Sequence, residues 1–186
     1  ICAQIPVLSL KTRLALVIHA KELKRTSNSG RLAARALSNS VVRIRGETKF
    51  PTDLSDLLSS DYESYVLFPS EDAIELSTIK SEKPIQLIVS DGNWRQASKI
   101  NTRHPELRHL PRVKMTRHNE AKYHLRKEHF ASGFSTLEAI AIAFSLIEGD
   151  EVGFKLLELY NAKLTATWLA RGVDIAKTSP AFLPEM

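Results

Sequence analysis

Apolar residues in this chain gather into short runs that polar and turn-forming segments separate. Five runs have the length and the β-branched or aromatic content typical of strands. They cover residues 14–18, 41–45, 65–68, 85–89 and 112–115. The first is continuously apolar, which predicts a buried strand, the fourth is apolar except at Gln86, and 41–45 alternates, which predicts a half-exposed strand. The fifth is the weakest of the set.

Helical patterns fill most of the intervals between these runs. We expect helices over 30–37, with Asn28 or Ser29 as cap, over 54–59, with Thr52 or Asp53 as cap, and over 94–101. Two more close the chain: one places Leu137, Ile140, Phe144 and Ile147 on a single face, and the other covers 151–170. Strands that alternate with helices predict one α/β domain over 1–186, with a mostly parallel sheet and an irregular tail over 171–186.

The fourth apolar run ends in the sequence Ser-Asp-Gly-Asn-Trp, at residues 90–94. This order predicts a strand, a tight turn and the start of a helix. Open α/β sheets bind ligands at the carboxyl ends of their strands, so Asp91 is placed where a carboxylate can meet a ligand. The alternative is structural, because Asp is also a favoured cap for the helix that follows.

Composition and targeting signals narrow the class of protein. The chain has 186 residues, of which 43% are hydrophobic and 25% charged, as in ordinary soluble domains. It has neither an apolar run of about 20 residues nor a signal-peptide pattern, so we expect a cytoplasmic protein that does not associate with a membrane. Because Ile1 is not a methionine, we do not expect it to be the biological start. A single cysteine, Cys2, excludes an internal disulfide.

Positive charge is concentrated in one segment, 103–129, although the net charge is only +5. Clustered cations are typical of surfaces that bind a phosphate backbone, and the alternative is a solvated charged surface. Five of the six histidines lie there too, and we interpret them as surface groups that can stack on bases. The candidate RNA-binding residues in the segment are Arg103, Arg108, Arg112, Lys114, Arg117, Lys122, Arg126 and Lys127; the histidines are His104, His109, His118, His124 and His129.

Several motifs, in this order, resemble the DTW-domain family, the tRNA-uridine aminocarboxypropyltransferases. Asp91 and Trp94 match the Asp and Trp for which the family is named, and Asn93 stands where its threonine is expected. The resemblance covers about residues 2–150. Its other motifs are residues 19–22, 28–33, 67–71, 110–113, 123–126 and 135–141.

The resemblance implies a fold, a reaction and two ligands. The fold is Rossmann-like and related to SPOUT methyltransferases, with a C-terminal knot. The reaction moves the 3-amino-3-carboxypropyl group of S-adenosylmethionine to N3 of a tRNA uridine and releases methylthioadenosine. Family members also carry an N-terminal cysteine cluster that looks like a zinc site; Cys2 matches its last cysteine, and one thiolate does not make a structural zinc site, so we expect no metal.

The resemblance also suggests roles for particular residues. Asp91 is the candidate general base that takes the proton from uridine N3. Ser135 and Thr136 open a Ser-x-x-Glu capping box, and a helix start of this kind can also meet the carboxylate of the transferred group. Residues 28–31 form a similar start, which can bind that carboxylate or a tRNA phosphate through Arg31. The candidate cofactor-binding residues are Leu67, Phe68, Pro69, Trp94, Leu110, Pro111, Ser135 and Thr136.

Three alternatives stay open at this point. Trp94 either stacks on a flat ring or anchors its helix in the core. The enzyme is either an aminocarboxypropyltransferase or an S-adenosylmethionine-dependent RNA methyltransferase, and these differ in their by-product. The third reading is an RNA-binding module without catalysis, in which Asp91 is only a cap. For either enzyme, we expect the strand ends at Phe68 and Asp91 and the helix start at Ser135 to meet at one pocket.

Overall fold

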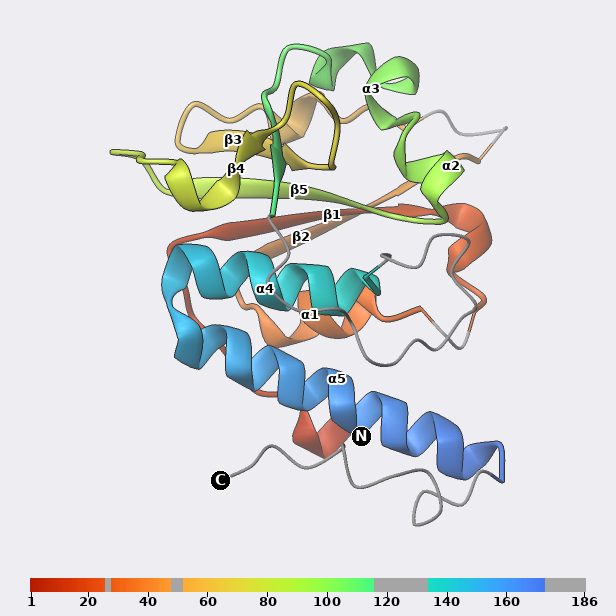
Figure 1. Cartoon of the computed structure of the whole chain (residues 1–186). Coiled ribbons are helices and arrows are strands. Elements are labelled where there is room, and N and C mark those ends of the chain that lie inside the picture. The colour runs from red at the N-terminus through yellow and green to blue at the C-terminus, as the bar shows by residue number, and fades with distance from the viewer. Residues whose placement is uncertain (26–27, 48–51, 116–133, 173–186) are drawn as a thin grey trace.

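A sheet of six parallel strands organises the chain (Figure 1). The computed structural model describes residues 1–25, 28–47, 52–115 and 134–172. The strands lie in the order β2-β1-β5-β3-β6-β4, so β5 is inserted between two strands that precede it in the sequence. Their bounds are β1 Arg13–His19, β2 Ser40–Arg45, β3 Glu63–Leu67, β4 Ile74–Glu75, β5 Ile85–Asp91 and β6 Arg112–Lys114.

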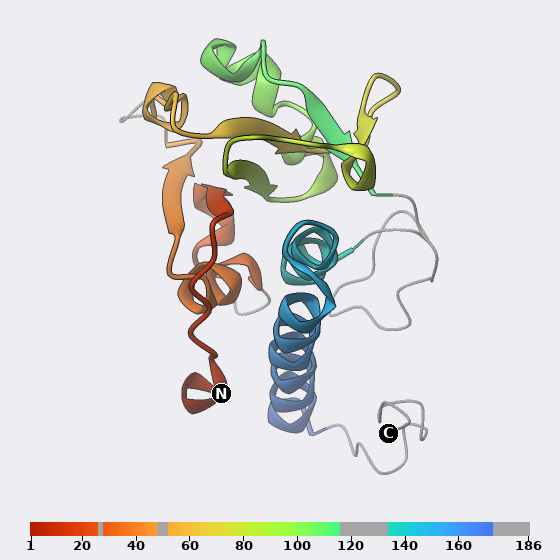
Figure 2. The same cartoon turned by 90° about the vertical axis from the view of Figure 1, so that its left-hand side faces the viewer.

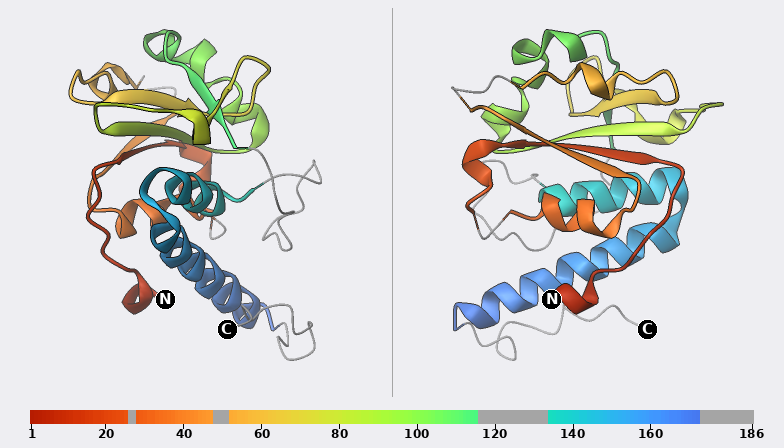
Figure 3. Two further views of the ribbon diagram at one scale, coloured as in Figure 1. Left: turned by 60° about the vertical axis from the view of Figure 1, so that its left-hand side comes forward. Right: turned by 180° about the vertical axis from the view of Figure 1, so that it is seen from behind.

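Helices cover both faces of the sheet, as Figures 1 and 2 show. One face carries α1 (Gly30–Ala36), α4 (Thr136–Glu148) and α5 (Asp150–Ala170). The other carries α2 (Trp94–Ala97), α3 (Ile100–Arg103) and the 3-10 turns Ser55–Leu57 and Pro105–Leu107. Further 3-10 turns are Cys2–Gln4, Ala20–Glu22 and Leu76–Thr78. The segment that begins at Ile1 passes the end of α1, where the Leu8 amide donates to Ala36 O at 2.8 Å, before it enters β1 (Figure 3).

Two apolar clusters form the core, one on each face of the sheet. Along β1, Leu14, Leu16 and Ile18 pack into the cluster under α1, α4 and α5. The intervening Ala15 and Val17 pack into the second cluster, with Leu54, Leu57, Ile100 and Leu107. Because successive side chains of a strand point to opposite faces, a central strand covered on both faces is mostly apolar. This explains the apolar run of β1 and that of β5, in which the buried Gln86 donates hydrogen bonds to Leu57 O and Ser64 Oγ.

Most elements expected from the sequence are confirmed. The parallel sheet agrees with the α/β prediction, and all five expected strands are present. The two-residue strand β4 is too short to leave a pattern and was missed. The helix expected over 94–101 is divided into α2 and α3, and the one over 54–59 is a single turn with Asp53 accepting a hydrogen bond from the Ser55 amide at 2.9 Å.

Other expectations fall on parts of the chain outside the described residues. These include most of the expected tail, from residue 173 onward, and residues 116–133 of the basic segment. In the described part of the chain, no helix carries the apolar stretch that crossing a bilayer requires.

The connections that follow the neighbouring strands β1 and β5 run in opposite directions along the sheet and over opposite faces. The chain leaves β1 through α1, on one face, and continues into β2 on one side. It leaves β5 through α2 and α3, on the other face, and continues to β6 beyond β3. In doubly wound sheets, the carboxyl ends of two such strands form the usual ligand-binding crevice. Ile18 of β1 pairs with Asp91 of β5 at this edge.

Candidate functional site

Asp91 is the last residue of β5, and its carboxylate joins two helix starts. The side chain is buried, with 5% exposure for the residue. Its Oδ1 accepts a hydrogen bond from Thr136 Oγ1 at 2.6 Å, and its Oδ2 accepts one from Asn28 Nδ2 at 2.7 Å. Asn28 precedes α1 and Thr136 begins α4. The carboxylate therefore ties together three segments that are far apart in the sequence.

Close packing around Asp91 requires a residue without a side chain at position 30. A Cβ on Gly30 would lie 2.9 Å from Asp91 Oδ2 and 3.1 Å from Thr136 Cγ2. The neighbouring Ser29 Oγ accepts a hydrogen bond from the amide of Leu137 at 3.2 Å. The starts of α1 and α4 are thus in direct contact, and Gly30 permits the approach.

Most donors at the start of α4 already have partners within the protein. Ser135 Oγ accepts from the Glu138 amide at 3.2 Å, and Glu138 Oε2 accepts from the Ser135 amide at 3.2 Å. This confirms the predicted capping box. With the Leu137 amide bonded to Ser29, the Thr136 amide is the one first-turn donor of α4 for which the described residues supply no acceptor. A ligand carboxylate at this helix start would meet Thr136 first.

Asn93, and not Asp91, caps the helix that follows β5. Its side chain accepts from the Gln96 amide at 2.9 Å, and Gln96 Oε1 accepts from the Asn93 amide at 2.8 Å. The interpretation of Asp91 as the cap of this helix is therefore wrong. Because Thr and Asn are both effective N-caps, the departure from the family's Asp-Gly-Thr-Trp at this position retains the local structure.

A buried arginine, which the sequence analysis missed, holds the other side of this turn. Arg45 ends β2 and is 2% exposed. It donates hydrogen bonds to Gln96 O and, at 3.3 Å, to Ser90 Oγ. Burial lowers the pKa of the Arg45 guanidinium, and burial and the neighbouring Arg45 charge both lower the pKa of His19. The sequence offered one indication of this buried arginine, namely that Arg45 is the last residue of a run in which apolar and polar residues alternate.

An aromatic pair lies at the same edge of the sheet, on the α2 side. The ring centroids of Phe68 and Trp94 are 4.9 Å apart with the planes tilted by 39°, and the Arg112 guanidinium lies 5.9 Å from the Phe68 centroid. Trp94 is 50% exposed, so the alternative of a core anchor is wrong. Leu110 and Phe68 border the second apolar cluster, while Leu67 packs on the opposite face.

The predicted cofactor-binding residues thus lie on both faces of the sheet, and they do not all lie at its carboxyl edge. Leu67, Phe68 and Pro69 are at the end of β3, whereas residues 110–111 precede the parallel strand β6, and Pro111 O accepts from the Val66 amide at 3.0 Å. Ser135 and Thr136 lie with Asp91 on the α4 side. That these groups share one cofactor pocket stays a prediction.

The predicted RNA-binding residues are divided in the same way. Arg103, Arg108, Arg112 and Lys114 belong to the elements around α3 and β6, whereas Arg31 lies on α1. Arg117, Lys122, Arg126 and Lys127 lie outside the described residues, as do His118, His124 and His129. His104 is a correction: it is buried and its Nδ1 lies 3.2 Å from Glu106 Oε1, so it is not a surface group, although His109 is exposed.

Metal-binding residues do not gather anywhere in the described segments: no three His, Cys, Asp or Glu side chains are grouped there as an ion requires. Cys2 is an exposed free thiol.

Comparisons with known proteins show the family of the chain. The family model described as "DTW domain" matches residues 1–167, and the chain belongs to that family. It is 24% identical over 156 residues to "tRNA-uridine aminocarboxypropyltransferase 2" of Macaca fascicularis, and 25% identical over 156 residues to the protein of that name from Mus musculus. Each alignment covers 80% of this chain and 52% of the relative, so the chain spans about half the length of these relatives. No solved structure matches it.

Proposed function

We propose that this protein transfers the 3-amino-3-carboxypropyl group of S-adenosylmethionine to N3 of a tRNA uridine, with release of methylthioadenosine. The observation that carries this is the place of Asp91. A carboxylate from the motif that names the family lies at the edge where doubly wound sheets bind ligands, held by two helix starts. The names of the relatives supply the reaction class and the tRNA.

The donors and surfaces at this edge suit S-adenosylmethionine. Its adenine is a flat ring that can lie on the half-exposed Trp94 beside Phe68, with Leu110 as an apolar wall. Its ammonium group needs an acceptor and its carboxylate a donor, which Asp91 and the Thr136 amide can supply. The bound cofactor contributes a carbon that the adjacent sulfonium makes electrophilic.

Asp91 carries a carboxylate, which can accept the uridine proton. The bonds from Asn28 and Thr136 each use a lone pair on a different oxygen. These bonds fix the orientation of the carboxylate before the substrate arrives. We propose that Asp91 is the general base, with Asn28 and Thr136 as the residues that position it.

Three further statements are part of this proposal. The fold is related to that of the SPOUT methyltransferases and has a C-terminal knot. The protein is located in the cytoplasm, and the basic side chains of 103–129 contact the RNA.

One experiment tests the reaction directly. We expect mass spectrometry of tRNA nucleosides, after incubation with the protein and S-adenosylmethionine labelled in the methionine chain, to show a uridine that gained one aminocarboxypropyl group. Methylthioadenosine should accumulate in equal amount. Methylated nucleoside with S-adenosylhomocysteine would identify a methyltransferase instead. If neither product forms while tRNA binds, a module without catalysis is the better reading.

A further inference from the structure

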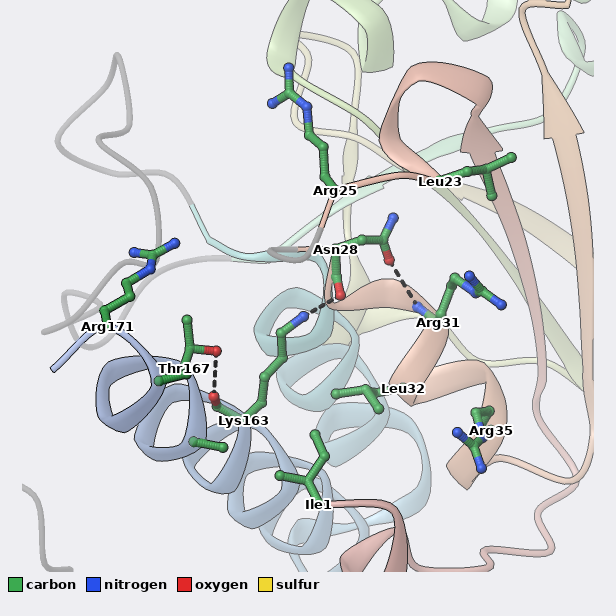
Figure 4. A pocket seen from close by; sticks show the side chains of 12 residues that line it. Ile1, Leu23, Arg25, Asn28, Arg31, Leu32, Arg35, Lys163, Thr167 and Arg171 are labelled. Atoms are coloured by element: carbon green, nitrogen blue, oxygen red, sulfur yellow. Dashed lines mark hydrogen bonds between the residues drawn. The ribbon is translucent and has the colours of Figure 1, made fainter.

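A basic groove lies between α1 and the C-terminal half of α5, away from the aromatic pair. Its volume is about 710 Å³. Five of the twelve residues that line it are cationic, and the other seven include no acidic residue. Figure 4 shows the five around one opening: Arg25 before α1, Arg31 and Arg35 on α1, Lys163 on α5, and Arg171 just after α5.

The positive charges clustered in the groove slightly lower the stability of the fold. Arg31 and Arg35 are four residues apart on α1 and therefore lie on the same face, where like charges destabilise an exposed helix by a few tenths of a kcal/mol. Arg31, Arg35 and Arg171 are exposed. Within the described residues, no carboxylate pairs with the side chain of Arg31 or Arg171. These guanidinium groups are therefore available to an anionic partner.

A direct chain of hydrogen bonds links this groove to Asp91. Asn28 lines the groove, its Nδ2 donates to Asp91 Oδ2 at 2.7 Å, and its carbonyl oxygen accepts a hydrogen bond from the buried Lys163 (Figure 4). Asn28 therefore connects the lining of the groove directly to the proposed base. An RNA strand seated there would bring one of its nucleotides to this end of the site.

We propose that the groove between α1 and α5 binds the tRNA phosphate backbone next to the reacting uridine. This rests on the proposed function for the identity of the RNA. The groove is open, and its arginines present guanidinium groups that suit phosphate oxygens. The groove lies on the face of the sheet opposite α3, so this binding site is separate from the surface that carries Arg103 and Arg108.

The test compares three double variants in tRNA binding over a range of salt concentrations. Arg31→Ala/Arg35→Ala removes two groove charges. Lys11→Ala/Lys80→Ala removes two exposed charges before β1 and β5, at the other edge of the sheet, and is the matched control. Arg103→Ala/Arg108→Ala samples the opposite face. Thermal unfolding of each variant checks that the fold is retained.

We expect the groove pair to weaken tRNA binding and to lower the slope of log affinity against log salt by about 2, one for each lost phosphate contact. A lower slope for the Arg103/Arg108 pair would support the contacts proposed for 103–129 as a separate surface. The Lys11/Lys80 control should keep the wild-type slope. A groove pair that binds tRNA like the wild type would overturn the proposal. So would binding of polyglutamate through the same arginines with tRNA binding unchanged, because the occupant would then be an acidic protein.

Failure of the groove and failure of the proposed function give different results. If the wild type forms aminocarboxypropyl-uridine and the groove pair binds tRNA normally, the groove assignment is wrong and the reaction stands. If the wild type forms no such product and the groove pair still lowers the salt slope, the reaction is wrong and the groove stands as an RNA site.

Discussion

At the residue scale, the hydrogen bonds of Asp91 make Asp91→Asn a clean test of its role. The amide oxygen can still accept from Asn28, and the amide nitrogen can donate to Thr136 Oγ1, whose hydroxyl can rotate to accept. We therefore expect little change in thermal stability. Without a proton acceptor, turnover should fall about 10²–10⁴-fold.

Cofactor affinity, measured by calorimetry, separates two roles for Asp91. If turnover falls while S-adenosylmethionine binds as before, Asp91 acts on the uridine. If the variant loses the cofactor, Asp91 holds its ammonium group and the base is another group or water. Normal turnover would remove Asp91 from the reaction altogether.

Gly30 is the second residue whose replacement has a defined outcome. In Gly30→Ala the added Cβ would meet Asp91 Oδ2 at 2.9 Å and Thr136 Cγ2 at 3.1 Å, so α1 and α4 must move apart. The better helix propensity of Ala opposes this by at most about 1 kcal/mol. We expect a net loss of about 1–2 kcal/mol in unfolding free energy, measured by denaturant titration, together with lower turnover.

The double variant Gly30→Ala/Thr136→Ser supplies the control for this contact. Serine lacks the Cγ2 methyl group but keeps the hydroxyl that donates to Asp91. It should recover part of the lost stability. If it recovers none, the contact with Thr136 is not what makes glycine necessary at position 30.

At the scale of the element, α2 depends on its capping box because it has only four residues, Trp94–Ala97. Asn93→Ala should cost about 1 kcal/mol of stability, since it removes the side-chain acceptor of the Gln96 amide and leaves only the Asn93 carbonyl oxygen. Asn93→Thr, which restores the family's residue, should lie within a few tenths of a kcal/mol of the wild type. Chemical unfolding of the two variants side by side measures both, and equal stability of Asn93→Ala and the wild type would show that capping is not the contribution of Asn93.

At the scale of the whole molecule, the order of the strands creates the site. β5 lies between β1 and β3, so its carboxyl end meets the starts of α1 and α4, which are separated by more than 100 residues of chain. The same layering places the basic groove on the α1 side and the aromatic pair on the α2 side. Asn28, which lines the groove and bonds to Asp91, connects the groove with the Asp91 site.

The sequence by itself determined the elements and the family. Continuous apolar runs predict strands covered on both faces, Ser135 and Glu138 form the predicted cap, and the turn at residues 90–94 directs attention to Asp91. These signals are local, because periodicity and capping depend on residues within a few positions of one another.

Only the tertiary structure decided which segments meet. No local pattern reports that Asn28, Asp91 and Thr136 come together, that Arg45 is buried against Gln96, or that His104 is internal. An apolar face indicates that something covers it but not which element does so, because that choice is made by packing between distant parts of the chain. The groove between α1 and α5 has the same origin: its cations come from residues 25–35 and 163–171, more than 120 residues apart, and only the fold gathers them on one surface.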